Sequence, residues 1–163
     1  MLEITDNDPA LKRKLGHLVS IPGVSFITAA AIVGETMGFE TMTNVKQLTS
    51  YAGYDVVLRE SGNYRGKPRI SKKGNSNIRG ALHMPSMTCA RCNPSLKPFY
   101  DRLKAKKAKP LVALVAVQRK LLILMYTLWK NEIDYDPNFE QKKQQKPKAF
   151  AARDNNLICQ AVS

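Results

Sequence analysis

The chain has 163 residues, 44% of them hydrophobic, and a formal net charge of +13 from 26 Lys and Arg against 13 Asp and Glu. This length suits one domain with appendages, and the apolar content suffices for a core, which excludes wholesale disorder. The basic surplus favours a polyanionic partner, either nucleic acid or an acidic membrane surface. Three cysteines are too few for a disulfide scaffold and indicate a reducing compartment.

No basic start followed by an apolar run opens the chain, so no secretory signal is predicted. The longest apolar stretch, residues 111–129, is interrupted by Gln118, Arg119 and Lys120, and the flanks that remain are too short to span a bilayer. We therefore expect a soluble cytoplasmic protein, associated with the nucleoid and without a membrane partner.

The basic residues are concentrated in two segments. Residues 59–79 and residues 91–109 each hold seven Lys or Arg and one acidic residue. Such runs are often only solvated surface, but their concentration here favours contacts with nucleic-acid phosphates.

The first half of the chain predicts short helices. Leu11, Leu15 and Leu18 recur at helical spacing in residues 9–20, and the sequence IPGV at 21–24 predicts a turn. Residues 25–37 predict a helix rich in small residues, capped by Ser25 and ended by Gly38. A third short helix follows a cap at Thr43 or Asn44 and ends at Gly53.

The second half predicts a hairpin and longer helices. Residues 56–58 and 64–70 predict the strands of a basic β-hairpin around a turn at 61–63. Helices are expected at 76–91, at 95–107 with Pro94 in the first turn, and at 110–130, the last being the central core helix or an oligomer seam. The predicted fold is mainly α: a helix-hairpin-helix, then a basic β-hairpin and a bundle of three longer helices. Residues 138–163 are expected to form a flexible, disordered basic tail.

The first two helices, joined by the turn at Gly23, resemble a helix-hairpin-helix element. Glycine allows an unusual φ there, and the first amides of the next helix, at its positive dipole end, suit a phosphate. Ser25 stands where the usual pattern has a second glycine, and its hydroxyl can also donate to a phosphate. The alternative is a plain helical hairpin in which the small residues serve packing alone.

Ser71 is the candidate nucleophile, in the segment GKPRISKKGNSNIRGAL at 66–82. A serine hydroxyl needs activation, and neighbouring cations can stabilise the charge that develops on a phosphodiester under attack. The alternative is that Ser71 only caps a turn. The candidate nucleic-acid-binding residues are Gly23, Ser25, Arg65, Lys67, Arg69, Lys72, Lys73 and Arg79.

No metal site is predicted on this chain. The acidic residues are scattered singly, which disfavours metal-assisted phosphoryl transfer by this chain alone. Cys89 and Cys92 have the spacing of half a zinc site, but we interpret them as ordinary helix cysteines because no second pair follows. His17 and His83 are interpreted as surface or half-buried residues. Four tyrosines could stack on bases, although packing is the simpler role; they are Tyr51, Tyr54, Tyr64 and Tyr100.

The order of five segments closely resembles one protein family. The segments are IPGVSFITAAAIVGE, QLTSYAGY, GKPRISKKGNSNIRGAL, ARCNPSLKPFYDRL and VALVAVQRKLLILMYTLW. Together they resemble the C-terminal domain of the DEDD-type insertion-sequence transposases, also called bridge-RNA-guided recombinases. By this resemblance residues 1–137 form the transposase C-terminal domain.

The resemblance implies a catalytic role for Ser71, because the family's catalytic serine lies in the segment that matches residues 69–74. It implies a composite active site, built between protomers on DNA and a structured guide RNA. Family members also carry an N-terminal ribonuclease-H-like domain with four acidic residues that bind a divalent metal. That domain has no counterpart in this sequence, so we expect a fragment without its own cofactor that is inactive alone and homo-oligomeric when full length.

Two other functions remain open. One is a non-catalytic helix-hairpin-helix module that binds the backbone of DNA or structured RNA. The other is an interaction protein whose basic surface meets an acidic protein or a lipid.

Overall fold

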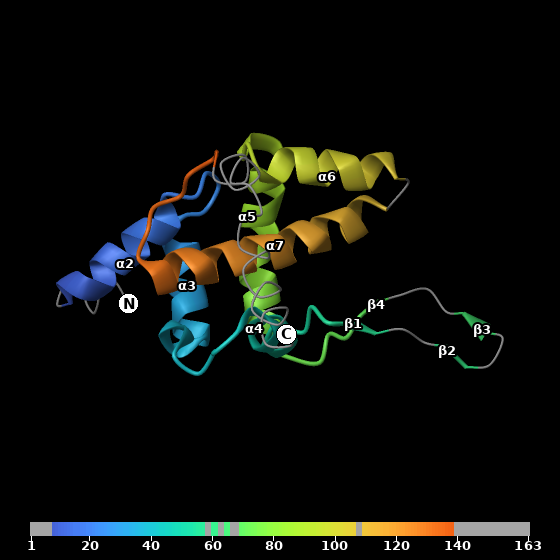
Figure 1. Ribbon diagram of the computed structural model, residues 1–163, viewed down its shortest axis with the longest axis horizontal. Coiled ribbons are helices and arrows are strands. Elements are labelled where there is room, and N and C mark those ends of the chain that lie inside the picture. Colours follow the sequence, from blue (N-terminus) through green and yellow to red (C-terminus); the bar gives the residue numbers. More distant parts are fainter. Residues whose placement is uncertain (1–7, 58–59, 62–63, 66–68, 107–108, 139–163) are drawn as a thin grey trace, which may run out of the picture.

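The computed structural model describes residues 8–57, 60–61, 64–65, 69–106 and 109–138 (Figure 1). The expected mainly helical fold is confirmed. The helices are α2 (Pro9–Val19), α3 (Phe26–Glu35), the 3-10 turn η1 (Met37–Phe39), α4 (Val45–Tyr51), α5 (Ser76–Cys92), α6 (Leu96–Ala105) and α7 (Pro110–Asn131). The strands are β1 (Val56–Val57), β2 (Glu60–Ser61), β3 (Tyr64–Arg65) and β4 (Arg69–Ile70).

Helix α7 is the centre of the core. It packs against α2, α4, α5 and α6, while α3 packs against α2 and α5 (Figure 1). Leu121, Leu122 and Met125 are fully buried on it. By length and hydropathy alone α7 could also cross a membrane, contrary to the expectation from its polar interruption, but half of its apolar window is buried inside the fold. This burial is the pattern of a core helix.

Side-chain caps explain where most helices begin. Asp8, Ser25, Asn44 and Asn75 each accept hydrogen bonds from first-turn amides of α2, α3, α4 and α5. Pro110 opens α7, where its missing amide proton is not needed. The caps predicted at Ser25 and at Asn44 are thereby confirmed, whereas the caps at Asp8 and Asn75 were not predicted.

The predicted place of Pro94 at the start of the next helix agrees with the hydrogen bonds. The assigned helix α6 begins at Leu96, one residue after the predicted start. The Asn93 side chain accepts hydrogen bonds from the amides of Ser95 (3.0 Å) and Leu96 (3.1 Å), and Asn93 O accepts one from the amide of Lys97 (2.9 Å), so Asn93 acts as the cap and Pro94 follows it directly.

The predicted end of α3 was too late. The helix ends at Glu35, not at residue 37. Met37, Gly38 and Phe39 have φ values of 49°, 64° and 58°, which a right-handed helix does not accommodate.

The predicted β-hairpin is confirmed, and it projects from the helices (Figure 1). We name the part of the chain from β1 to β4 the arm. At its base β1 and β4 pair antiparallel, with Val56 opposite Ile70. Farther out β2 and β3 pair antiparallel, with Ser61 opposite Tyr64. Ser61, predicted as part of the turn, belongs instead to β2 because it pairs with Tyr64. The predicted strand residue Leu58 and the turn residues Gly62 and Asn63 lie outside the described residues.

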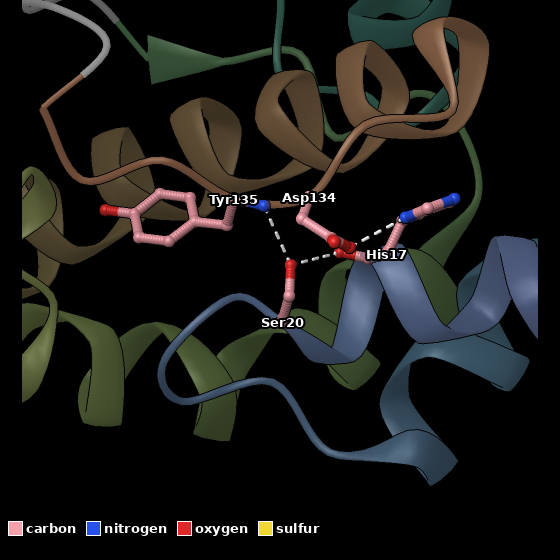
Figure 2. A network of polar contacts seen from close by, with 4 residues as sticks. All are labelled: His17, Ser20, Asp134 and Tyr135. Carbon is pink, nitrogen blue, oxygen red and sulfur yellow. Dashed lines mark hydrogen bonds and ion pairs between the residues drawn. The ribbon is translucent and has the colours of Figure 1, made fainter.

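Residues 132–138, which we name the C-terminal strap, return from α7 to α2. His17 Nδ1 pairs with Asp134 Oδ1 at 2.7 Å, and the amide of Tyr135 donates to Ser20 Oγ at 2.9 Å (Figure 2). The Tyr135 hydroxyl donates to Asn93 Oδ1 at 2.8 Å. The strap therefore connects the end of α2 to the junction between α5 and α6. The predicted tail lies outside the described residues except for Asn138.

Candidate nucleic-acid interface

The backbone holds Ser71 in place against the chain segment that follows α4. The amide of Ser71 donates to Asp55 O at 2.7 Å, that of Lys72 to Gly53 O at 3.1 Å, and that of Asn75 to Tyr51 O at 2.8 Å. We name residues 71–75 the Ser71 turn and residues 51–55 the corner. Because three amides of the turn bond to the corner, Ser71 has a fixed position relative to the helices.

The side chain of Ser71 is half-buried and is not enclosed in the core. Its Oγ accepts a hydrogen bond from the amide of Lys73 at 3.2 Å. This is the contact expected of a serine that caps a turn, the alternative to a nucleophile. The hydroxyl proton is not used by this contact. Ser71 can therefore cap the turn and still present its oxygen to a ligand.

Gly74 is required by the close approach of the turn to the corner. Its φ is +155°, and a Cβ atom there would lie 2.4 Å from Tyr51 O and 2.8 Å from the amide nitrogen of Gly53. Any other residue would displace the Ser71 turn.

Arg79 binds protein backbone in this structure. Its Nη1 donates to the carbonyl oxygens of Ala52 (2.9 Å), Asn75 (3.2 Å) and Gly74 (3.4 Å). A role for Arg79 in binding nucleic acid stays a prediction, while its role in joining α5 to the corner and the turn is visible.

Glu35 holds the start of α5. Its two carboxylate oxygens accept hydrogen bonds from Asn75 Nδ2 at 2.6 Å and from Asn77 Nδ2 at 2.9 Å. The sequence showed Glu35 only as an isolated acid, and nothing in its spacing marked this link from α3. The positive end of a helix dipole attracts a carboxylate, and the Glu35 carboxylate lies beside the N-terminus of α5. That helix end therefore already has an anion next to it.

A groove of about 920 Å³ lies beside the Ser71 turn, between the base of the arm and the N-terminal half of α7. Its lining residues are Tyr54, Val56, Val57, Arg69, Ile70, Ser71, Lys72, Lys73, Leu111, Val112, Val115, Ala116 and Arg119. All four charged residues in this set are cations, and all four are exposed: Arg69, Lys72, Lys73 and Arg119. The groove therefore combines a cationic rim with aliphatic walls.

Sequence reasoning found three of these four cations and missed Arg119. Arg69, Lys72 and Lys73 lie together with Ser71 as expected. Arg119 lies on α7, which the fold brings to the groove, and no local pattern could have indicated this. Of the other candidates, Arg65 lies farther out on β3, and Lys67 lies outside the described residues.

Tyr54 contributes to the groove from the core side. It is almost fully buried and its hydroxyl donates to Gln118 Oε1 at 3.2 Å, while Gln118 Nε2 contacts His83 Nδ1 at 3.1 Å. Burial raises the pKa of Tyr54 above its usual value, so its phenol stays protonated. The hydroxyl of Tyr51 donates to Glu35 O. Both tyrosines therefore make hydrogen bonds within the protein, and stacking of Tyr51 or Tyr54 on bases stays a prediction.

The turn at Gly23 lies far from the Ser71 turn. Gly23 has φ +101°, and a Cβ there would lie 2.9 Å from Cys89 Sγ, near the C-terminal end of α5. Asn75, which caps α5, is 14 residues before Cys89. At about 1.5 Å per helical residue, the two turns are about 20 Å apart along α5.

Packing explains the residues around Gly23. Cys89 is buried and its Sγ donates to Pro22 O at 3.2 Å, and burial raises the pKa of its thiol to about 11. Ser25 Oγ accepts from the amide of Thr28 at 3.3 Å and caps α3. Contacts of Gly23 and Ser25 with phosphate stay predictions.

The described part of the chain holds no group of three or more His, Cys, Asp or Glu residues that could bind a metal ion. The described residues therefore offer no ligand set that fits a divalent metal. The resemblance assigns that metal to the N-terminal ribonuclease-H-like domain.

Comparison with known protein families decides the identity of the chain. Residues 16–101, more than half of its length, match the family described as Transposase IS116/IS110/IS902 family. The chain belongs to this transposase family. The matched part of the transposase chain runs from α2 into α6 and includes the whole Ser71 turn.

Curated relatives are much longer than this transposase chain. It is 26% identical over 122 residues to an insertion element IS110 uncharacterized 43.6 kDa protein of Streptomyces coelicolor, which covers 73% of the chain and 29% of the relative. It is 25% identical over 138 residues to a pilin gene-inverting protein of Moraxella lacunata, covering 82% of the chain and 42% of the relative. An insertion element IS900 uncharacterized 42 kDa protein of Mycobacterium paratuberculosis is 22% identical over 142 residues, covering 83% and 36%. The chain thus spans less than half of each of these relatives.

Proposed function

We propose that this chain is the DNA-binding part of a transposase that supplies Ser71 as the nucleophile for strand exchange in DNA transposition. Membership of the family supports a role in transposition or recombination, and with it DNA as a partner. One relative is named a pilin gene-inverting protein, which agrees with DNA rearrangement as the general activity.

The observation that carries the proposal is the place of Ser71 beside an all-cationic groove rim. Three backbone hydrogen bonds fix the turn, and Lys72 and Lys73 follow directly. Arg119 adds a cation from a distant part of the chain. A phosphodiester bound there would lie within reach of the hydroxyl, and the cations would stabilise the added negative charge in the transition state.

The covalent step is a transesterification. Ser71 Oγ forms a bond to phosphorus while its proton passes to a base outside this chain. The bond from phosphorus to one deoxyribose oxygen breaks, and that oxygen takes up a proton from the protonated base, so the protons balance. The phosphodiester is conserved, so rejoining to a new strand needs no external energy source.

The rest of the machinery is also part of the proposal. The resemblance implies an N-terminal ribonuclease-H-like domain, a structured guide RNA and further copies of the protein. We propose that this chain meets all three on chromosomal DNA in the cytoplasm, with Ser71 completing a composite active site.

The test is a covalent-adduct assay with a full-length transposase that carries this domain. Denaturing the reaction with DNA should trap a protein–DNA adduct that mass spectrometry maps to the Ser71 peptide. Ser71→Ala should abolish both adduct and recombination while DNA affinity stays within about twofold, because the cations remain. Ser76→Ala, an exposed serine at the start of α5, is the matched control and should recombine normally.

A second function is favoured by one contact. The hydrogen bond from the Lys73 amide to Ser71 Oγ suits a serine that only caps a turn in a non-catalytic module binding nucleic acid. In that case Ser71→Ala would recombine at the wild-type rate, or the adduct would map to another residue.

A further inference from the structure

The groove beside Ser71 is lined by exposed aliphatic side chains, which binding to a paired DNA duplex does not require. Val56, Leu111 and Val112 line it and are 60%, 63% and 60% exposed. The outside of a duplex presents phosphates and sugars, and its bases are stacked on one another. Exposed aliphatic side chains therefore gain little from a fully paired duplex, whereas they gain contact with a base that has left its stack.

We propose that this groove holds an unstacked nucleotide of the DNA strand next to Ser71. The proposal rests on the proposed function for the identity of the strand, but not on nucleophilic attack by Ser71. The base packs against Leu111, Val112 and Val56, and the adjoining phosphates lie along Lys72, Lys73 and Arg119. Leu111 and Val112 would act like the apolar wedges by which other proteins unstack a base step.

Charge decides between a nucleotide and a protein occupant. Among the described residues, every charged side chain in the groove lining is Lys or Arg. A protein segment docking on the aliphatic walls would need acidic side chains placed opposite these cations, because a rim of cations without partners disfavours its approach. A nucleotide carries an apolar face and an obligatory negative charge in one unit, which matches walls and rim together.

The size of the groove also fits. Its volume of about 920 Å³ lies within the range of about 300–1,000 Å³ typical of small-molecule pockets. One wall is the base of the arm, which the hydrogen bonds of Ser71 and Lys72 tie to the segment after α4, and the other wall is α7 of the core. The groove is therefore present in the chain without DNA.

The test compares two short DNA duplexes with the full 163-residue chain, by fluorescence anisotropy at fixed salt. One duplex is fully paired, and the other has the same sequence with a few unpaired nucleotides at the centre of one strand. The chain should bind the second about tenfold more tightly, as expected when a free base buries apolar surface against the aliphatic walls. 2-Aminopurine among the unpaired nucleotides should report a changed environment on binding.

The double variant Leu111→Ser, Val112→Ser should lose this preference and keep its affinity for the paired duplex. Both side chains are exposed, so circular dichroism and melting should be unchanged. The matched control is Met84→Ser on α5, which is 68% exposed and is not among the groove residues; it should keep the preference.

Equal affinity for the two duplexes, or a double variant that keeps the preference, would overturn the proposal. Tighter binding when the unpaired nucleotides are RNA would overturn the assignment to DNA. A wild-type dimer in light scattering that the double variant converts to a monomer would assign the groove to a second copy. None of these results depends on the covalent-adduct assay, so the two proposals fail separately.

Discussion

Arg79 and Ala52 are joined by a hydrogen bond of 2.9 Å from the guanidinium Nη1 to the carbonyl oxygen. The same nitrogen also reaches Gly74 O and Asn75 O. One side chain on α5 thereby joins both backbone segments that define the position of Ser71, the corner and the turn.

Arg79→Met should lower the free energy of unfolding by about 1–3 kcal/mol, because carbonyl groups that are partly buried lose a charged donor. Urea denaturation measures this loss. Lys73→Met is the control, since Lys73 is exposed on the groove rim. It should leave stability unchanged and reduce the salt dependence of DNA binding by about one counterion. Equal stability of the two variants would contradict the structural role of Arg79.

Gly74→Ala should destabilise the protein on the order of 3 kcal/mol, because the added Cβ meets the backbone of Tyr51 and Gly53 at a strained φ. Gly80→Ala is a matched control on α5, where a Cβ meets nothing within 4 Å. That change should stabilise by about 0.5–1 kcal/mol, since alanine favours a helix. Thermal melting of both variants gives the comparison, and a Gly74→Ala protein as stable as wild type would disprove the close approach.

Cys92 should react with iodoacetamide in the folded protein well before Cys89 does. Cys92 is exposed, whereas Cys89 is buried and its pKa is raised to about 11, so almost no Cys89 thiolate exists at pH 8. Peptide mapping by mass spectrometry separates the two sites. Adding denaturant should make the rates similar, and fast labelling of Cys89 without denaturant would contradict its contact with Pro22.

The ion pair between Lys14 and Glu132 should make a small contribution to stability that depends on pH. The hydrogen bond from Lys14 lowers the pKa of Glu132 below its usual value of 4.5, and the two charges lie 2.8 Å apart. A lowered pKa in the folded state stabilises above the unfolded pKa, and this stabilisation is lost as pH falls through the folded pKa.

The measurement is a double-mutant cycle of melting temperatures with Lys14→Met and Glu132→Gln. The coupling between the two changes should be present at neutral pH and absent in strong acid. A coupling that grows as the pH falls would show that the sign is wrong.

Local sequence signals predicted most of the helices and the arm. Two helix starts followed from the predicted caps Ser25 and Asn44, and the periodicity of leucines placed the buried face of α2. The end of α3 was misplaced because Met37 and Phe39 adopt positive φ values beside Gly38, and only the glycine in this run could be recognised from the sequence.

The candidate site was predictable only where it is local in sequence. Ser71, Lys72 and Lys73 adjoin one another, so their proximity needed no fold. Arg119 and Leu111 reach the groove through the packing of α7, and Glu35 reaches α5 across 40 residues. Arg79 was predicted to bind DNA because it is a cation in a basic segment, but composition carries no information about which carbonyl groups lie within its reach.

The arm leaves the helical body and returns to it at one place. Val56 pairs with Ile70, and the amide of Ser71 bonds to Asp55 O, so the two ends of the arm are neighbours. The entropy of closing a loop rises only slowly with its length, by about 0.6 kcal/mol for each doubling. A change in the number of residues in the arm therefore costs little free energy of folding and leaves the position of the serine that follows it unchanged.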